Sequence, residues 1–344
     1  EFRRVLFRSE SEMKKLGCML MAVLMAVAVS GCSDKKEASE NKETEKKVTL
    51  ILDYLPNTNH TGFYVAKEKG FFKEEGLDVD IIEPGDDSTS ATLVAANKGE
   101  FGVSYQEDVT YARTAEEPLP IRAIATIIQH NTSGFVSLKK ENIKSPKDFE
   151  GKVYAGWQAP SEEAVVKAVM TAAKADFSKL TMVGADGSGF ASLGKSVDIQ
   201  WEFEGWAVTK GRMEGYDLKY IPLRELDERL DYYTPVIITS EKMIKEDPET
   251  VQKFMNAVKK GYEYAIENPD AAAEILSKYA PDYDLKFLKE SQKYLSSEYA
   301  RDADSWGVMK DSVWDNYTAF MYENKLITEK IKADEQYTNE FVTK

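Results

Sequence analysis

The sequence contains very little cysteine and histidine, and it is short of positive charge. It has 2 Cys and 2 His in 344 residues, which excludes a disulfide scaffold and a zinc site built from Cys and His. Lys and Arg number 45 against 59 Asp and Glu, for a formal net charge of −14. Because binding to a phosphate backbone needs clustered Lys and Arg, we expect no nucleic-acid partner.

Familiar catalytic signatures are absent as well. The sequence has no H-E-x-x-H and no G-x-S-x-G motif, and we expect no enzyme activity, no metal site and no cofactor. Gly189–Ser196 matches the phosphate-binding pattern G-x-x-x-x-G-K-S, whose Lys and Ser must open a helix. The strand-like residues Val197–Trp201 come directly after it, so we expect a short helix, a Gly stop and a strand there.

The first 47 residues are interpreted as processing segments. Residues 1–12 differ in character from the rest of the chain and are taken as a non-native leader, and residues 13–31 as a lipoprotein signal peptide. The apolar run Leu16–Val29 is 14 residues long, too short to remain as a membrane span. It leads into Ser-Gly-Cys, which resembles a bacterial lipobox, so Cys32 is the predicted lipidation site. The charged residues 32–47 are predicted to be a disordered tether.

This interpretation predicts an extracytoplasmic protein that is anchored to the bacterial cell membrane by lipid. The alternative is an ordinary signal peptide in which Cys32 is incidental. Beyond residue 47 the chain has no Cys, which suits an oxidising compartment.

The remaining chain has the composition and the pattern of a folded α/β protein. The sequence is 42% hydrophobic and 11% aromatic, so it can bury a core, and its length suggests about two domains. Strand-like segments alternate with helical ones from Val48 to Ile128, and the alternation starts again at Gly151. This pattern predicts parallel, doubly wound sheets. From Glu241 onward the chain is predicted to be almost purely helical.

We therefore expect two α/β lobes and a helical C-terminal segment. Residues 48–134 begin lobe 1, residues 135–234 form lobe 2, and residues 235–344 complete lobe 1 and add the C-terminal helices. The lobes are expected to meet near residues 131–138 and again near residues 231–239.

Loops that come after strands carry unusual amounts of aromatic, amide and carboxylate chemistry. Ligands of open α/β sheets bind beyond the carboxyl ends of the strands, and flat rings with carboxylates suit a planar, nitrogen-rich ligand. Four loops stand out: Asp53–Gly62, Tyr105–Asp108, Ala155–Glu163 and Trp201–Trp206. Purely structural roles remain open for some of these residues, because Phe203 and Trp206 can be core residues and His60 can be a residue that starts a helix.

The first of these loops resembles the opening of the family that contains fungal pyrimidine synthases and bacterial pyrimidine-precursor-binding proteins. The resemblance rests on L-D-Y-x-P-N-T-N-H-T-G from Leu52 to Gly62, although the family usually has Asp-Trp where this chain has Asp53-Tyr54. The looser motifs G-W-x-x-P-x-E from Gly156 and F-E-G-W from Phe203 resemble the bacterial transport branch. The resemblance extends over about Val48–Tyr279.

The resemblance implies a two-lobe, type II periplasmic-binding-protein fold that closes on a thiamin-pyrimidine precursor. The partners it implies are a small pyrimidine ligand and an ABC permease with its ATPase subunit. The ligand type of the bacterial branch is a formylated aminomethylpyrimidine. Among the candidate residues, the stacking rings are Tyr54, Trp157 and Trp206; the hydrogen-bonding residues are Asp53, Asn57, Glu202 and Glu204; and the remaining ones are His60 and Gln106.

Three other functions stay open from the sequence. A receptor of the same fold can bind a sulfonate or a nitrate-like ion, but the candidate loops offer no Arg. Riboflavin or another flat heterocycle is harder to separate from a pyrimidine. A pyrimidine synthase is the third, although the fungal enzymes use the motif His as a substrate and need a Cys-rich iron-binding stretch that this chain lacks.

Overall fold

The structure, a computed structural model, describes residues 45–85 and 88–343. The expected leader, the signal peptide, the lipidation site Cys32 and residues 32–44 of the expected tether lie outside the described residues. The last tether residues differ from expectation, because strand β1 (Lys46–Ile51) already includes Lys46 and Lys47. Lys46 pairs in register with Leu77 of the next strand, and its ammonium forms an ion pair with Asp247.

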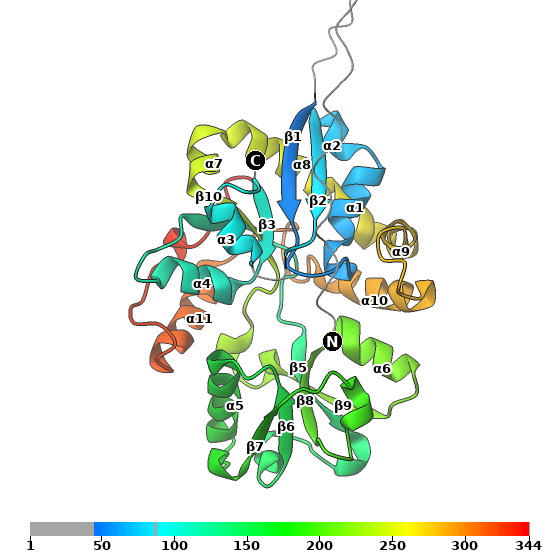
Figure 1. Ribbon diagram of the computed structural model, residues 1–344, viewed down its shortest axis with the longest axis vertical. Coiled ribbons are helices and arrows are strands. Elements are labelled where there is room, and N and C mark those ends of the chain that lie inside the picture. The colour runs from blue at the N-terminus through cyan, green and yellow to red at the C-terminus, as the bar shows by residue number, and fades with distance from the viewer. Residues whose placement is uncertain (1–44, 86–87, 344) are drawn as a thin grey trace, which may run out of the picture. The chain divides into compact units, whose positions relative to one another are not determined.

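The first sheet has five strands in the order β2-β1-β3-β10-β4, of which β2, β1, β3 and β10 are labelled in Figure 1. Its strands are β1, β2 (Leu77–Ile82), β3 (Phe101–Ser104), β4 (Ile121–Thr126) and β10 (Val236–Ser240). The second sheet also has five strands, in the order β7-β6-β8-β5-β9. Its strands are β5 (Ser133–Leu138), β6 (Val153–Gly156), β7 (Thr181–Gly184), β8 (Ile199–Phe203) and β9 (Leu218–Pro222).

Both sheets are mixed, which corrects the expectation of parallel sheets. β1, β2 and β3 are parallel, as are β6, β7 and β8, whereas β10 and β5 run antiparallel to their neighbours. β5 and β10 are the first strands after the chain crosses from one sheet to the other. A strand that arrives from the opposite sheet enters at the end where the parallel strands finish, so it runs against them. The α/β class itself is confirmed.

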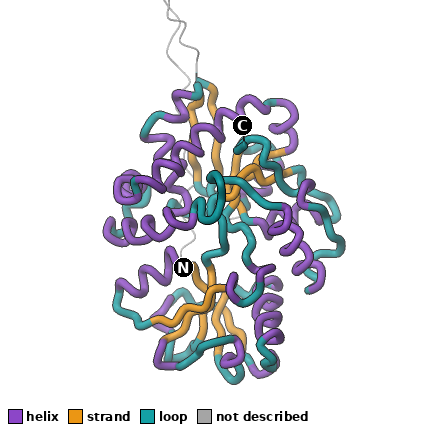
Figure 2. The backbone as a smooth tube through the Cα atoms, turned by 180° about the vertical axis from the view of Figure 1, so that it is seen from behind, coloured by secondary structure: helices purple, strands orange, loops and turns teal. Residues whose placement is uncertain are grey.

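Helices flank both sheets, and each sheet with its helices forms one lobe (Figure 2). The helices are α1 (Thr61–Glu68), α2 (Phe71–Glu74), α3 (Ser90–Ala95), α4 (Gln106–Thr114), α5 (Pro160–Ala172), α6 (Thr209–Met213), α7 (Glu241–Glu246), α8 (Pro248–Glu267), α9 (Pro269–Ser277), α10 (Leu285–Glu298) and α11 (Asp311–Glu323). None of the helices within the described residues is long and apolar enough to cross a membrane.

Helices α1 and α8 pack closely because glycines face each other where they meet. A Cβ on Gly62 would lie 2.3 Å from the Tyr262 ring, and a Cβ on Gly261 would lie 2.0 Å from the Gly62 carbonyl oxygen. Gly62 is therefore required by packing. One core of the first lobe joins its sheet to α1, α8, α9 and α10.

Helix α11, one of the C-terminal helices, packs against both lobes. Trp314 packs in a core cluster with Tyr233 and other residues of the first lobe. Tyr317 and Phe320 pack instead with the core of the second sheet. The C-terminal segment thus completes both lobes.

The P-loop-like segment behaves as a connector. Gly189–Ser192 forms one 3₁₀ turn, Gly194 has a φ of +71°, and β8 begins at Ile199. The Lys and Ser of the pattern do not open a helix, so this segment lacks the geometry that cradles phosphate.

Candidate ligand-binding site

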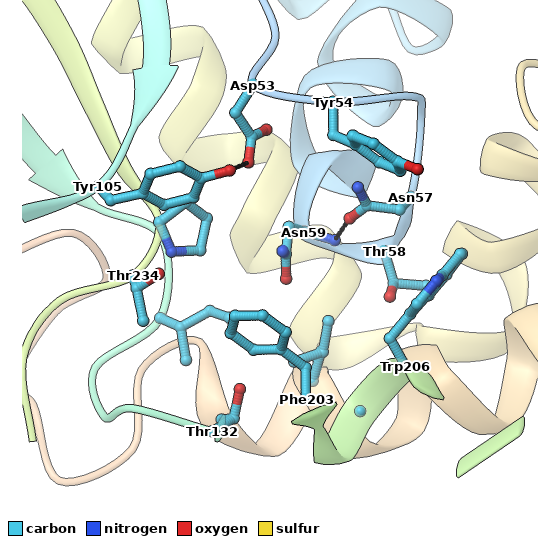
Figure 3. A pocket seen from close by; sticks show the side chains of 14 residues that line it. Asp53, Tyr54, Asn57, Thr58, Asn59, Tyr105, Thr132, Phe203, Trp206 and Thr234 are labelled. Atoms are coloured by element: carbon cyan, nitrogen blue, oxygen red, sulfur yellow. Dashed lines mark hydrogen bonds between the residues drawn. The ribbon is translucent and has the colours of Figure 1, made fainter. Parts of the chain in front are cut away.

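A cavity of about 220 Å³ lies between the two lobes, at the ends of β1, β3 and β8 (Figure 3). Most of its polar lining comes from the loop after β1, and its rings come from both lobes. The lining residues are Asp53, Tyr54, Asn57, Thr58, Asn59, Tyr105, Ile128, Thr132, Phe203, Gly205, Trp206, Thr234, Pro235 and Leu295. In Figure 3 the rings of Tyr54 and Phe203 lie on opposite sides of this space, with Trp206 to one side and Tyr105 to the other.

Asp53 is the carboxylate of this first cavity. Its Oδ2 accepts a hydrogen bond from the Tyr105 hydroxyl at 2.8 Å, and its Oδ1 lies 2.6 Å from His60 Nε2. Burial acts to raise the pKa of Asp53, but the neighbouring His60 and the hydrogen bonds from His60 and Tyr105 outweigh it and hold that pKa below its ordinary value. Asp53 is therefore a fixed, ionised acceptor at neutral pH.

His60 supports Asp53 from behind. Its Nδ1 accepts the Asn57 N–H at 3.3 Å, which leaves Nε2 as the protonated nitrogen that donates to Asp53. The His60 residue is 0% exposed, so the ring is a positioning group. The Asn57 side chain accepts the Asn59 N–H at 2.9 Å and donates to the Leu55 carbonyl oxygen at 3.0 Å. The Asn57 side chain and the His60 ring each accept a backbone N–H of the turn Thr58–His60 and its N-cap, which makes a reciprocal cap on this 3₁₀ turn.

Helix α10 holds this loop in place. Thr58 Oγ1 and Ser291 Oγ lie 2.6 Å apart, and Thr61 donates to Gln292 Oε1 at 2.6 Å. The same helix supports the second lobe, because Ser291 also donates to the Gly205 carbonyl oxygen.

Trp206 packs on the same helix. Its ring centroid lies 4.7 Å from that of Phe287 and 4.9 Å from that of Tyr283, both in edge-to-face contact. Part of the Trp206 indole is thus packed against other rings, and another part lines the cavity. Trp206 is therefore both a packing residue and a residue that faces the cavity.

A second cavity, about 310 Å³ in volume, adjoins the first and is here called the tryptophan cavity. It shares Tyr105, Phe203 and Thr234 with the first cavity. Its other lining residues are Glu107, Asp108, Ser133, Trp157, Ser161, Trp201 and Tyr232. Trp157 is 56% exposed, with its centroid 4.9 Å from that of Trp201.

Glu162 fixes the position of Trp157. This carboxylate is 1% exposed and accepts the N–H of Trp157 at 3.2 Å and the N–H of Gln158 at 2.6 Å. The Tyr154 hydroxyl donates to it at 2.6 Å. Three donors compensate for the burial of the charge, so the loop before α5 is held rigid.

The remaining candidates lie elsewhere. Gln106 is 0% exposed, and its amide bonds to the Tyr233 N–H at 2.8 Å and to the Val313 carbonyl oxygen at 3.1 Å. Glu204 was a candidate for a hydrogen bond to the ligand, but its carboxylate accepts from Arg212 at 3.2 Å and from Tyr294 at 3.1 Å and lines a separate hollow with Arg212.

Glu202 lies on the other face of β8 from Trp201 and Phe203, because successive side chains of a strand alternate. It is half-buried, and burial raises its pKa to about 7. The structure thus brings together Asp53, Tyr54, Asn57 and Trp206 at the first cavity and places Trp157 at the adjoining one.

Several lining residues were not among the candidates. Tyr105 lines both cavities and Phe203 projects between them. The sequence carried a signal for each: Tyr105 opens the loop after β3, and Phe203 alternates with the two glutamates of its segment. The positioning role of Glu162 was not predicted, although this residue ends the motif G-W-x-x-P-x-E that begins at Gly156.

Comparisons with known proteins agree with this architecture. A sequence model described as NMT1/THI5 like matches residues 57–272. The formylaminopyrimidine-binding protein of Halalkalibacterium halodurans is 25% identical over 331 residues, which cover 93% of this chain and 98% of that protein. The 4-amino-5-hydroxymethyl-2-methylpyrimidine phosphate synthase THI13 of Saccharomyces cerevisiae is 24% identical over 86% of this chain and 88% of the enzyme.

A solved structure shares the fold. The alkanesulfonate-binding protein SsuA of Xanthomonas axonopodis pv. citri, bound to MOPS, matches with a TM-score of 0.64 at 11% identity, over 85% of this chain and 98% of that one. The two-lobe periplasmic-binding-protein fold expected from the resemblance is thereby confirmed. Because the matching sequence model spans more than half of the chain, this protein belongs to the NMT1/THI5-like family.

Proposed function

We propose that this protein is a non-enzymatic solute receptor that binds a 4-aminopyrimidine precursor of thiamin between its lobes and delivers it to an ABC importer. The observation that carries the proposal is the chemistry of the cleft. Its two cavities are lined by aromatic rings and carboxylates, and none of the described residues that line them is Lys or Arg. Rings stack on a flat heterocycle, and a carboxylate accepts hydrogen bonds from its amino group.

Each residue has a role in this proposal. Tyr54, Phe203 and Trp206 supply ring faces around the pyrimidine, and Asp53 accepts the exocyclic amino group. If a ring nitrogen is protonated, the charge of Asp53 strengthens that bond.

The same lining argues against an anionic ligand. A sulfonate or nitrate bound away from water needs a positive partner or an array of N–H donors. The cleft instead presents Asp53, Glu107 and Asp108, which would repel an anion. The shared fold with a sulfonate-binding protein therefore does not extend to this ligand class.

The environment of His60 favours a receptor over a synthase. The resemblance implies that the fungal enzymes consume the motif His as a substrate. Here both ring nitrogens of His60 are engaged and the residue is fully buried. The histidine thus lies behind the wall of the site, where it holds Asp53 in place.

Calorimetry with a matched set of ligands tests the proposal. The set is 4-amino-5-hydroxymethyl-2-methylpyrimidine, riboflavin and methanesulfonate. We expect binding of the pyrimidine and no heat from methanesulfonate, and native mass spectrometry of freshly purified protein should find a pyrimidine retained. Binding of methanesulfonate or riboflavin without the pyrimidine would contradict the proposal, as would pyrimidine product formed with iron and pyridoxal phosphate.

Anchoring through Cys32 is a separate part of the proposal. The support is the short apolar run before Ser-Gly-Cys and the charged segment after it. We expect Cys32→Ser to release the protein from the membrane or to leave its precursor uncleaved, because the lipid supplies about 0.8 kcal/mol per buried CH₂. Unchanged processing and membrane association would refute this anchor.

A further inference from the structure

The segment that follows β8 belongs to the second lobe but lies against a helix of the first. β8 ends at Phe203, and the π-helical turn Glu204–Val208 comes next. Val208 is buried in a core cluster of the second lobe, whereas α10 contributes Phe287 to the core of the first lobe. Contacts between this turn and α10 therefore join the two lobes. Residues Phe203–Trp206 are here called the docking segment.

Gly205 approaches α10 so closely that a side chain at this position would collide with the helix. A Cβ on Gly205 would lie 2.8 Å from Tyr294 Cδ1 and 3.1 Å from Leu295 Cδ2. Gly205 does not have a positive φ, so its backbone conformation would admit alanine. The glycine is therefore required by the approach of the two lobes and not by the turn itself.

A buried hydrogen bond fixes the same contact. Ser291 of α10 is 0% exposed and donates to the Gly205 carbonyl oxygen. Because this donation uses the only proton of the Ser291 hydroxyl, the Thr58 hydroxyl must be the donor in the bond that joins it to Ser291 Oγ at 2.6 Å. Thr58 lines the first cavity. The docking segment is thus hydrogen-bonded, through Ser291, to the wall that the first lobe gives to this cavity.

Trp206 adds an aromatic anchor to the contact. Its ring packs edge-to-face against Phe287, in α10, and against Tyr283, which comes just before that helix. Such contacts are attractive beyond the area that they bury. Neither Phe287 nor Tyr283 is among the described residues that line the first cavity. The two rings therefore hold Trp206 from the side that faces away from a ligand.

The docking segment also faces the site of the ligand. Phe203, Gly205 and Trp206 all line the first cavity (Figure 3). A ligand shifts a receptor toward its closed form only through contacts that are better in that form. Since the residues that a ligand would touch are continuous with those that dock on α10, binding and docking can support each other.

We propose that the docking segment is the latch of the closed receptor and that Gly205 is a positioning residue for ligand binding. Gly205 lets the second lobe close on α10, and Trp206 then lies between the ligand and the rings of Tyr283 and Phe287. This inference rests on the proposed function, for which it names a contact that closure requires. It predicts that a change on the α10 side of the segment weakens ligand binding without removing a ligand contact.

Gly205→Ala tests the latch. The added methyl group meets α10 only when the lobes are closed, so the ligand-free protein avoids the collision by opening. We expect calorimetry of the full-length variant with 4-amino-5-hydroxymethyl-2-methylpyrimidine to show binding weaker by about 10-fold or more. Without ligand, its unfolding temperature should stay within about 2 °C of that of the parent protein. A purely structural role of Gly205 would lower both quantities.

A matched control places the same methyl group inside one lobe. A Cβ on Gly211 would lie 2.4 Å from the Phe190 ring, within the second lobe. Gly211→Ala should therefore lower the unfolding temperature without ligand and leave the affinity of the folded protein close to that of the parent.

Two further variants act from the first lobe. Tyr294→Ala removes the ring that the Gly205 methyl group would meet, so the double variant should bind at least about threefold more tightly than Gly205→Ala alone. Tyr283→Ala withdraws one of the rings that hold Trp206 and should weaken the ligand by about threefold or more.

The outcomes separate the latch from the proposed function. If Gly205→Ala and Tyr283→Ala bind the pyrimidine as tightly as the parent, the latch is overturned and the proposed function stands. A loss of stability without ligand as large as that of Gly211→Ala also overturns the latch, because the contact then belongs to the fold and not to closure. This second outcome needs no ligand. If the parent binds riboflavin or methanesulfonate and not the pyrimidine, the proposed function fails, and the same comparison with that ligand decides the latch.

Discussion

At the scale of single residues, the site separates into groups that face the cleft and groups that hold them. Asp53, Tyr105 and His60 form one hydrogen-bonded chain in which only the last is fully buried. Glu162 plays a corresponding part behind Trp157. Mutating a residue that faces the cleft should alter ligand affinity. Mutating a residue that holds it in place should first alter the geometry of the site and the stability of the protein.

The two carboxylates Asp53 and Glu204 should differ sharply in binding assays. Asp53→Asn is expected to cost about 1.5–3 kcal/mol of pyrimidine binding, because it removes a charged acceptor for the amino group. Glu204→Gln is expected to change affinity by less than about 0.5 kcal/mol, since its carboxylate already pairs with Arg212 and Tyr294 at a separate hollow.

Titration calorimetry of both variants checks this prediction, with circular dichroism to establish the fold. Tyr105→Phe removes the hydrogen bond to Asp53 but keeps the carboxylate. Its loss of pyrimidine-binding free energy should therefore lie between the losses of the Asp53 and Glu204 variants. A larger loss in the Glu204 variant than in the Asp53 variant would reverse the assignment.

Asp108 should make stability depend on pH. Its folded-state pKa of about 6 lies above the value of about 3.9 in an unfolded chain. The folded state therefore binds more protons between these values, and this group lowers stability as the pH rises from about 4 to about 6. The groups that raise the pKa, besides burial, are Glu107 and Asp53, while the Ser104 hydrogen bond lowers it.

Asp108→Asn is accordingly expected to stabilise the ligand-free protein by about 1–3 kcal/mol above pH 6. The gain should fade toward pH 4, where the carboxyl is protonated in both states. Urea unfolding of the two proteins at several pH values measures this directly. A difference that does not vary with pH would contradict it.

At the scale of elements, α10 is the common support of both sides of the first cavity. It holds the Thr58–His60 turn of the first lobe and the Glu204–Val208 turn of the second lobe through Ser291. The specific sequence motif at residues 52–62 therefore mixes ligand-facing and structural residues.

Gly62 is the clearest structural member of that motif. Gly62→Ala should destabilise the protein by about 1–3 kcal/mol, because its Cβ would lie 2.3 Å from the Tyr262 ring in the contact between α1 and α8. Denaturant unfolding gives the cost. A variant as stable as the parent would mean that the two helices can separate without loss.

The sequence predicted elements well where local patterns decide them. From Glu241 onward the chain was expected to be almost purely helical, and helices α7 to α11 lie in this part of the chain. Strand β5 and the short helix α2 were not predicted, and the expectation of parallel sheets was wrong at β5 and β10. Direction depends on where a strand enters the sheet, which is a property of the whole chain path.

The site shows the same limit. Proximity to a strand end correctly indicated Asp53, Tyr54, Trp157 and Trp206 as cleft residues. Proximity to a strand end could not tell that Tyr105 lines the cavity and that its neighbour Gln106 is buried. The two residues differ only in the direction of their side chains at the start of α4. For Glu204, the partner Tyr294 lies 90 residues away in the sequence, so a local pattern could not indicate the pairing.

At the scale of the whole molecule, the lobes touch through different elements. Helix α5 contacts α4 through Ser161 and Glu107, and the segment after β8 contacts α10 through Glu204 and Tyr294. Arg224 adds an ion pair to Glu298 at 2.8 Å. The Glu204–Tyr294 hydrogen bond is single and partly exposed, so its loss on opening costs little in water, whereas the Glu298 carboxylate is buried and its ion pair with Arg224 costs more to break.

Ligand binding should therefore close the lobes and favour the arrangement in which these contacts are made. A ligand held by Asp53 and Tyr54 on one lobe and by Trp157 and Phe203 on the other binds the closed form more tightly than an open one, and this difference is what shifts the population.

We expect small-angle scattering to show a smaller radius of gyration when a thiamin pyrimidine is added. The Asp53→Asn variant at the same ligand concentration is the control, because it should bind weakly and contract less. If calorimetry shows saturation of the parent protein and the scattering profile is unchanged, the lobes do not move on binding and the ligand enters a cleft that is already closed.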